Sequence, residues 1–211
     1  AVTTLLLATA LSGCSGISGI VGGSDSVEVP TWEVGDWWLY TFSTPDYTDD
    51  TARLVVASVS EEGGTANMLA ISSLTEARRH AVLNHNPFLG RMTHEDLAAF
   101  ENGVAQTVMD FPLEEDANWG FTLFSVEWSA DVRGVSGNYV TMGASSADGS
   151  KLDYVYDTDA QFFSSFIWTD ASDVEQLRMM LADSGEGHSG DVYFVRGGDL
   201  LSDVWEDTGP D

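Results

Sequence analysis

From residue 27 onward, hydrophobic and polar positions alternate with a period of two, and the alternation is interrupted by turn residues, which predicts β-strands. The alternation is clearest over residues 121–133. One face there collects the apolar residues Phe124, Val126, Trp128, Ala130 and Val132. Polar or charged residues occupy the positions between them, so we expect one core face and one solvent face of an antiparallel sheet. Trp128 should be buried on the core face.

Residues 37–42 predict a strand that is covered on both sides. They follow a Gly-Asp turn and place Trp38, Tyr40 and Phe42 on one face, with Trp37 and Leu39 on the other. Further strands are predicted over 52–60 and 66–72, joined by a Gly-rich loop, and over 139–145 and 151–157, joined by a turn at 147–150. Segments 162–168, 174–182 and 191–196 are also strand candidates, and 174–182 fits a helix equally well.

Two segments carry helix signals. Residues 75–83 form the best helix candidate, because Thr75 can cap the N-terminus, Glu76 suits its positive end and Pro87 prevents continuation. Residues 93–96 resemble a capping box, but Asn102-Gly103 is a strong hairpin signal with short apolar arms. We therefore predict a hairpin over 100–105.

No βαβ alternation and no fixed repeat is visible, and 43% of the residues are hydrophobic, which is enough to form a core. The prediction is an all-β or β-dominated fold with one short helix near 75–83. Its antiparallel strands would form either a sandwich or a strongly curved open sheet, a half-barrel. Residues 30–211 would form this single domain.

The N-terminus has the features of an export signal. Residues 1–11 are apolar apart from threonines, and the first charged residue is Asp25. This run is too short for a membrane-spanning helix, which needs about 20 residues, and it fits the apolar core of a secretory signal. It ends in Leu11-Ser12-Gly13-Cys14, which resembles the lipobox of prokaryotic lipoproteins and contains the only cysteine. The resemblance implies that a lipid is attached to the Cys14 thiol and that the peptide before it is cleaved.

Residues 1–13 are therefore expected to be the remnant of a signal peptide. Residues 14–29 would comprise the lipidated Cys14 and a flexible Gly/Ser-rich tether that holds the domain away from the membrane. The localisation that this predicts is the extracellular face of the cell membrane.

The start of the domain has a second resemblance. Trp32, Gly35-Asp36, Trp38 and Tyr40 are similar to the opening strand of many secreted archaeal β-proteins, which read Trp-x-x-Gly-Asp-x-Trp-x-Tyr. The stretch 111–113, Phe-Pro-Leu, followed by Trp119, resembles a later element of the same kind of domain. These short matches imply an extracellular archaeal β-domain, and they imply no active site.

The chain is strongly acidic, with 34 Asp and Glu residues against 8 Lys and Arg residues and a net charge of −26. This charge repels phosphates and anionic lipid headgroups, so we expect no nucleic-acid partner. The carboxylates are spread along the chain and Lys151 is the only lysine. This pattern favours adaptation to salt water, as in halophilic or marine archaea, over a dedicated cation-binding surface.

Catalytic and metal-binding signals are weak. His80 and His85 are five residues apart and do not share a helix face, and no partner is evident for His94 or His188. No serine outside the tether lies in a nucleophile motif, and a lipidated Cys14 could not act as a nucleophile. We therefore predict no catalytic residues.

Calcium is the one cofactor that the acidic turns could hold, because it takes several oxygen ligands from flexible loops. The candidate ligands are Asp46, Asp49 and Asp50 in one loop and Glu114, Glu115 and Asp116 in another. Asp157 and Asp159 form a third acidic turn, and none of the three has the spacing of an EF-hand loop.

Seven tryptophans are many for this length. Most should be core, including Trp128 and Trp168, whereas Trp32 and Trp205 lie near the domain ends and are expected to be exposed. We expect a lipid-anchored binding or structural module whose protein or glycan partner the sequence does not identify. The alternatives are a carrier that holds a hydrophobic ligand in a curved sheet and a secreted hydrolase.

Overall fold

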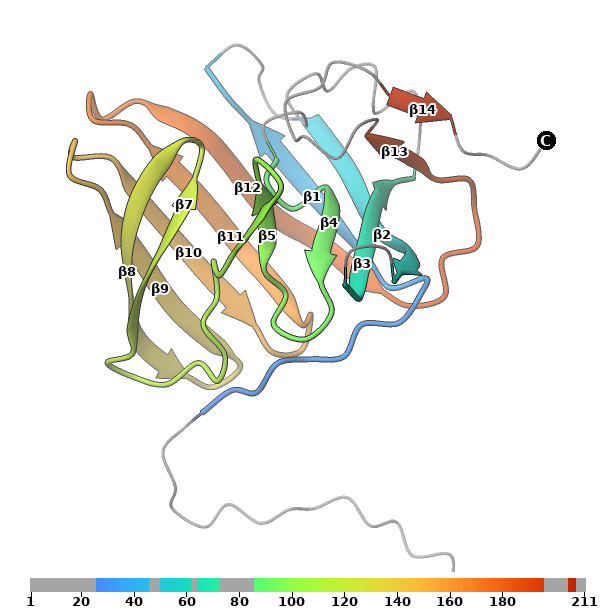
Figure 1. The fold of residues 1–211 in the computed structure, drawn as a ribbon, viewed down its shortest axis with the longest axis horizontal. Coiled ribbons are helices and arrows are strands. Elements are labelled where there is room, and N and C mark those ends of the chain that lie inside the picture. The colour runs from blue at the N-terminus through green and yellow to red at the C-terminus, as the bar shows by residue number, and fades with distance from the viewer. Residues whose placement is uncertain (1–25, 46–49, 62–63, 73–85, 196–204, 208–211) are drawn as a thin grey trace, which may run out of the picture.

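A computed structural model describes residues 26–45, 50–61, 64–72, 86–195 and 205–207. The described chain is all-β, with fourteen strands in one sheet and every pairing between strands antiparallel. Twelve of these strands follow one another around a strongly curved sheet that almost closes into a barrel (Figure 1). The predicted fold class is confirmed, and of its two forms the curved sheet is the one observed.

The barrel consists of two meanders of six strands each, in which every strand pairs with its neighbours in sequence. The first contains β1 (Trp37–Ser43), β2 (Asp50–Ser60), β3 (Ala66–Ile71), β4 (Gly90–Thr93), β5 (Ala99–Glu101) and β6 (Val104–Gln106). The second contains β7 (Asn118–Leu123), β8 (Val126–Ser136), β9 (Tyr139–Ser145), β10 (Lys151–Asp157), β11 (Phe162–Thr169) and β12 (Glu175–Gly185). A short C-terminal pair, β13 (Tyr193–Val195) and β14 (Trp205–Asp207), attaches to β3 through Tyr193 and Ile71.

The two meanders are joined by the pairing of β1 with β12, which runs from Trp37 opposite Gly185 to Ser43 opposite Arg178. The remaining gap in the barrel lies between β6 and β7. Side chains bridge it: Gln106 Oε1 accepts a hydrogen bond from the Thr122 amide at 2.7 Å, and Glu101 Oε1 accepts one from the Ser125 amide at 2.8 Å. These contacts occupy backbone donors on an otherwise open strand edge.

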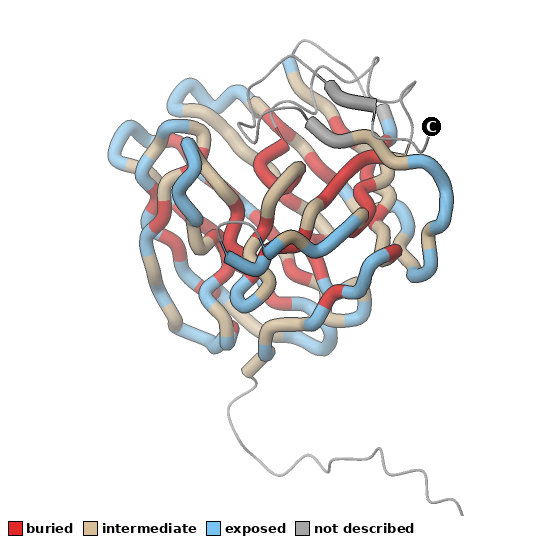
Figure 2. The backbone as a smooth tube through the Cα atoms, turned by 45° about the vertical axis from the view of Figure 1, so that its right-hand side comes forward, coloured by how far each residue is buried: buried red, intermediate tan, exposed pale blue. Residues whose placement is uncertain are grey.

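The interior of the described barrel is filled with aromatic and aliphatic side chains, and buried segments line the inner face (Figure 2). Residues 86–89 between β3 and β4 are all buried and bring Phe88 into the core. The ring of Phe88 lies 4.8 Å from that of Phe163 and 5.1 Å from that of Phe166. Trp128 is 3% exposed, as its place in the alternating pattern predicts.

Part of the wall is buried on its outer face as well. Trp37 and Leu39 are half-buried, and Val55 and Ala70 are buried although they lie outside the main core cluster. Trp37 and Val55 oppose each other across β1 and β2, and the Arg53 guanidinium lies 4.5 Å from the Trp37 ring. The prediction that this strand is covered on both sides therefore agrees with the half-burial of Trp37 and Leu39 on its outer face.

Two hairpin turns need backbone conformations in the left-handed region. Asn102 and Gly103, with φ of 50° and 77°, join β5 to β6 and confirm the predicted hairpin. Phe124 and Ser125, with φ of 57° and 59°, join β7 to β8. The prediction that residues 121–133 form a single alternating stretch of strand is thus wrong. The chain reverses at Phe124, and the alternation on the two sides belongs to two paired strands.

Trp32 corrects another expectation, because it is 2% exposed. Its ring packs 4.7 Å from Trp38 and 5.0 Å from Phe162, and its indole N–H donates to the Gln161 carbonyl at 3.0 Å. Segment 174–182 forms a strand rather than a helix. The packed chain extends N-terminally to Val27, which bridges to Leu113 and lies before the predicted domain boundary at residue 30.

Several predictions lie outside the described residues. These are the helix at 75–83, the signal and lipobox with Cys14, the loop residues Asp46 and Asp49, the histidines His80 and His85, and the Trp205 side chain. No helix among the described residues is long and apolar enough to span a bilayer.

Candidate functional site

The barrel has two ends, which the strand registers define. At the Trp32 end, β12 finishes, β1 begins and the turn 158–161 joins β10 to β11. At the Trp168 end, the turns at 124–125, 146–150 and 170–174 join β7 to β8, β9 to β10 and β11 to β12. The Trp32 end carries a polar hollow, and the Trp168 end carries an aromatic stack.

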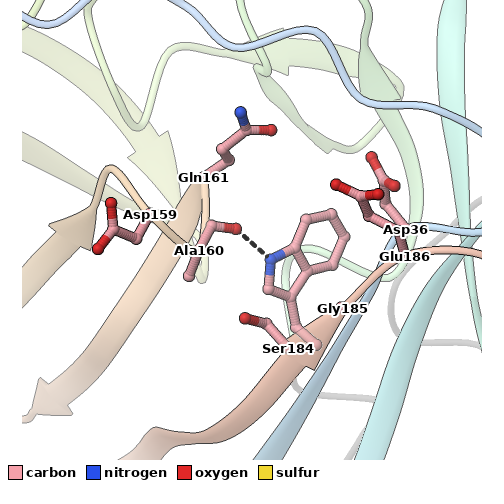
Figure 3. A pocket seen from close by; sticks show the side chains of 8 residues that line it. Asp36, Asp159, Ala160, Gln161, Ser184, Gly185 and Glu186 are labelled. Carbon is pink, nitrogen blue, oxygen red and sulfur yellow. Dashed lines mark hydrogen bonds between the residues drawn. The ribbon is translucent and has the colours of Figure 1, made fainter.

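The Trp32 end contains a small polar hollow of about 110 Å³ (Figure 3). It is lined by Asp36, Trp38, Asp159, Ala160, Gln161, Ser184, Gly185 and Glu186. These residues come from three places in the sequence: the start of β1, the β10–β11 turn and the end of β12. The pairing of β1 with β12 brings them together, since Trp38 opposes Ser184.

Two tryptophans fix the β10–β11 turn beside this hollow. The indole N–H of Trp38 donates to the Ala160 carbonyl at 2.7 Å (Figure 3), and that of Trp32 donates to the Gln161 carbonyl at 3.0 Å. Both rings are buried, so the two hydrogen bonds satisfy polar groups that would otherwise be costly. The wall of the hollow is therefore held in place by the core.

The carboxylates of the hollow largely serve the local backbone. Asp36 Oδ2 accepts the Glu33 amide at 2.7 Å, and Asp159 Oδ2 accepts the Asn138 side-chain amide at 2.6 Å. Asp157 Oδ1 accepts the amide of Asp159 at 2.9 Å. These bonds organise the turns, and within the described residues no group of three His, Cys, Asp or Glu side chains is placed to hold a metal ion.

Four of the predicted calcium ligands lie among the described residues. Glu114, Glu115 and Asp116 are exposed in the loop that precedes β7, and Asp116 has a φ of 67°. Asp50 is the first residue of β2. Calcium binding by these residues remains a prediction.

The two described histidines lie at the Trp32 end without a catalytic partner. His94 Nδ1 is 3.2 Å from the Asn67 side-chain oxygen, and the His188 amide donates to the Gly35 carbonyl at 2.8 Å. In the described part of the chain, neither imidazole is hydrogen-bonded to a carboxylate or a serine hydroxyl. Among the described residues, the histidines therefore form no hydrogen-bonded acid–base pair.

The Trp168 end carries a different feature, an aromatic stack. The rings of Phe124 and Trp168 lie 4.2 Å apart, with an angle of 4° between their planes. Both residues are half-buried and pack against the core, and Trp168 lies between its strand neighbours Leu152 and Leu177, which are fully buried. The sequence predicts Trp168 to be core, and it is half-buried at the rim of the core, packed against it.

Acidic turns surround this end. A backbone hydrogen bond from Val174, with further bonds from Ser172 and Gln176, lowers the pKa of Asp170. The pKa of Asp148 is lowered first by its hydrogen bond with Ser146 and then by Ser150. Both carboxylates therefore stay ionised at neutral pH and keep the potential here negative.

Sequence reasoning missed both arrangements. Asp36 and Glu186 are 150 positions apart and meet only because β1 pairs with β12, which no local pattern predicts. The sequence predicts a strand at Phe124, because Phe-Ser is not a turn signal. The available indication of a turn is a change of phase: the apolar residues are odd-numbered up to Leu123 and even-numbered from Phe124 onward.

No protein-family model, no curated protein and no solved structure matches the chain.

Proposed function

We propose that this chain is a lipoprotein, anchored through Cys14 on the extracellular face of the cell membrane, whose β-barrel acts as a binding or structural module. The anchoring rests on the lipobox-like Leu11-Ser12-Gly13-Cys14 and on the apolar run before it. The Gly/Ser-rich residues that follow would form the tether. The packed domain begins near Val27, on the Trp32 end, so the tether would enter the barrel there.

The observation that favours a module over a carrier is the filled interior. A carrier of a hydrophobic molecule needs an apolar cavity of a few hundred Å³. Here the described interior is occupied by side chains such as Tyr40, Phe88, Phe163 and Phe166, each 1% exposed or less, and the rings of Phe88, Phe163 and Phe166 lie 4.8–5.5 Å from one another. Ligands would therefore bind to the outer surface or the ends of the barrel.

The anchoring half of the proposal is tested by fractionation in a prokaryotic host that processes lipoproteins. The full-length gene with Cys14→Ser should yield protein in the soluble fraction, because no thiol remains to be lipidated. A Ser18→Ala variant in the tether is the matched control and should stay with the membrane. Equal membrane association of both variants would overturn the lipid anchor.

The module half is tested with N-phenyl-1-naphthylamine, which fluoresces in apolar cavities. The purified chain should give no saturable fluorescence increase, because its core is filled. Saturable binding with a stoichiometry near one would instead favour the carrier.

A further inference from the structure

The β7–β8 turn is built from residues that its backbone conformation does not favour. Phe124 and Ser125 both adopt left-handed φ values of 57° and 59°. The β5–β6 turn has a similar conformation with Asn102-Gly103, the residues that such turns prefer. A bulky residue in the left-handed region is an outlier that is energetically unfavourable and commonly marks a functional position.

The side chain of Phe124 makes a contact that this turn conformation allows. Its ring lies flat on Trp168, and this is the only parallel stack among the ring pairs of the described residues. The hydrogen bond from the Ser125 amide to Glu101 Oε1 holds the turn at this end of the barrel. Phe124 thus covers the indole face at the rim of the core.

The indole N–H of Trp168, the ring that Phe124 covers, lacks a hydrogen-bond acceptor. Its Nε1 atom is buried and has no hydrogen-bond partner. A buried donor without an acceptor loses its hydrogen bond to water and gains none in return, so it destabilises the fold. Two unfavourable features, a strained turn and an unpaired indole N–H, therefore meet at one aromatic stack, and both are relieved if Phe124 moves away and an acceptor reaches the indole.

We propose that Trp168 is the platform of a binding site for neutral oligosaccharides and that Phe124 is the displaceable ring that covers it. A sugar ring has an apolar C–H face that stacks on the electron-rich face of an indole. A hydroxyl of the adjoining sugar unit would accept the hydrogen bond from Nε1 at the edge of the ring. Leu152 and Leu177 hold the platform rigid from both sides.

The surroundings select for a neutral ligand. Asp148 and Asp170 lie in the turns at this end, Asp173 and Glu175 are paired with Lys151 and Arg178, and the molecule carries a net charge of −26. Uronic-acid polymers and nucleotides would be repelled. A lipid tail has no space behind the platform, because Leu152, Leu177 and Phe166 are fully buried there.

This inference specifies the ligand of the proposed module and does not depend on Cys14. Its test uses the full chain carrying Cys14→Ser, so a failure of sugar binding would not contradict the proposal of membrane anchoring. The probes for calorimetric titration are maltohexaose, cellohexaose and N-acetylchitohexaose, with hexagalacturonate as the anionic control. At least one neutral hexamer should bind, and hexagalacturonate should not.

Two variants assign the binding to the stack. Phe124→Asn combined with Ser125→Gly copies the β5–β6 turn and uncovers Trp168, so the hexamer should bind about fivefold more tightly, the factor expected when one aromatic pair no longer has to be broken. Trp168→Leu should weaken binding more than tenfold. Trp119→Leu is the matched control, because Trp119 is also half-buried with a buried, unpaired indole N–H but has no stacking partner. It should bind as the parent does.

A measurement on the parent protein covers the case in which Trp168→Leu fails to fold. Adding the hexamer should shift the indole N–H resonance of Trp168 in a ¹H–¹⁵N spectrum, and Trp168→Phe assigns that resonance. The proposal is overturned if no neutral hexamer binds either the parent or the opened turn. It is equally overturned if the bound hexamer leaves the Trp168 resonance unchanged.

Discussion

At the scale of single residues, Trp128 anchors the inner face of β8. It is 3% exposed, and its indole N–H donates to the Leu123 carbonyl at 2.9 Å, across the β7–β8 hairpin. Trp128→Ala should lower the free energy of unfolding by about 3–5 kcal/mol, because it removes a large buried ring and leaves a cavity. Urea denaturation measures this. Tyr139→Ala, at a residue 50% exposed on β9, is the control and should cost under about 0.5 kcal/mol. A loss below about 1 kcal/mol for Trp128→Ala would contradict the packing.

Three buried tyrosines make stability depend on alkaline pH. Burial raises the pKa of Tyr40, Tyr154 and Tyr156 above that of an ordinary tyrosine, and the charge of Asp157 adds to the effect at Tyr40 and Tyr156. The folded chain therefore keeps phenol protons that the unfolded chain releases near pH 10. The folded state then binds more protons, so the free energy of unfolding is unaffected below about pH 10 and falls as the pH rises above it.

The alkaline prediction is tested by urea unfolding at pH 8 and pH 11. The parent should lose stability between these values, and Tyr156→Phe should lose less, because one proton-linked contribution is gone. Both proteins share the same increase in negative charge on their other groups, so their difference isolates Tyr156. Equal losses would show that Tyr156 titrates alike in the folded and unfolded chains.

At the scale of elements, the gap between β6 and β7 is the weakest part of the barrel wall. Among the described strands none pairs with β7 on this side, and Gln106 Oε1 instead accepts a hydrogen bond from the Thr122 amide of β7 at 2.7 Å. Gln106→Ala should lower the free energy of unfolding by about 1 kcal/mol and speed hydrogen exchange at Thr122, because the amide loses its acceptor. Gln106→Glu keeps an acceptor oxygen and should retain the slow exchange. Unchanged exchange in Gln106→Ala would mean that the edge is protected in another way.

The elements show where sequence reasoning succeeds and where it stops. Local patterns predicted the β2–β3 and β9–β10 hairpins and the Asn102-Gly103 turn, because alternation and turn chemistry are local properties. They failed at Phe124-Ser125, where a stacking contact with Trp168 selects residues that a turn does not favour. They also failed at Trp32, whose burial depends on Phe162 and Gln161, residues far away in the sequence. The closure of β1 on β12 is equally non-local.

At the scale of the whole molecule, charge is unbalanced. Every cation in the described residues is already engaged. Arg133 lies between Asp131 and Asp153 at 3.4 and 2.6 Å, Lys151 is 3.3 Å from Asp173, and Arg178 pairs with Glu175. Arg53 and Arg91 lie over aromatic rings. We infer that most carboxylates rely on dissolved salt for screening, in line with the proposed adaptation to salt water.

The charge imbalance predicts a strong salt dependence of the melting temperature. The Debye length is about 30 Å at 0.01 M salt and about 3 Å at 1 M, so repulsion acts across the molecule only at low salt. The Tm should rise substantially between 10 mM and 1 M NaCl. Millimolar calcium at fixed ionic strength is the control, and a large further rise would favour specific ion sites such as the Glu114–Asp116 loop. An unchanged Tm in NaCl would contradict the inference.

The central claim is that a filled β-barrel is held on the membrane through a lipid on Cys14. Native mass spectrometry of the protein extracted from the membranes of a host that processes lipoproteins tests it most directly, because one spectrum reports the N-terminus, covalent lipid and any retained ligand. We predict a chain that begins at Cys14, carries a covalent lipid and retains no hydrophobic molecule in its core. An unmodified Cys14 with residues 1–13 still attached, or a lipid bound non-covalently inside the barrel, would contradict the account.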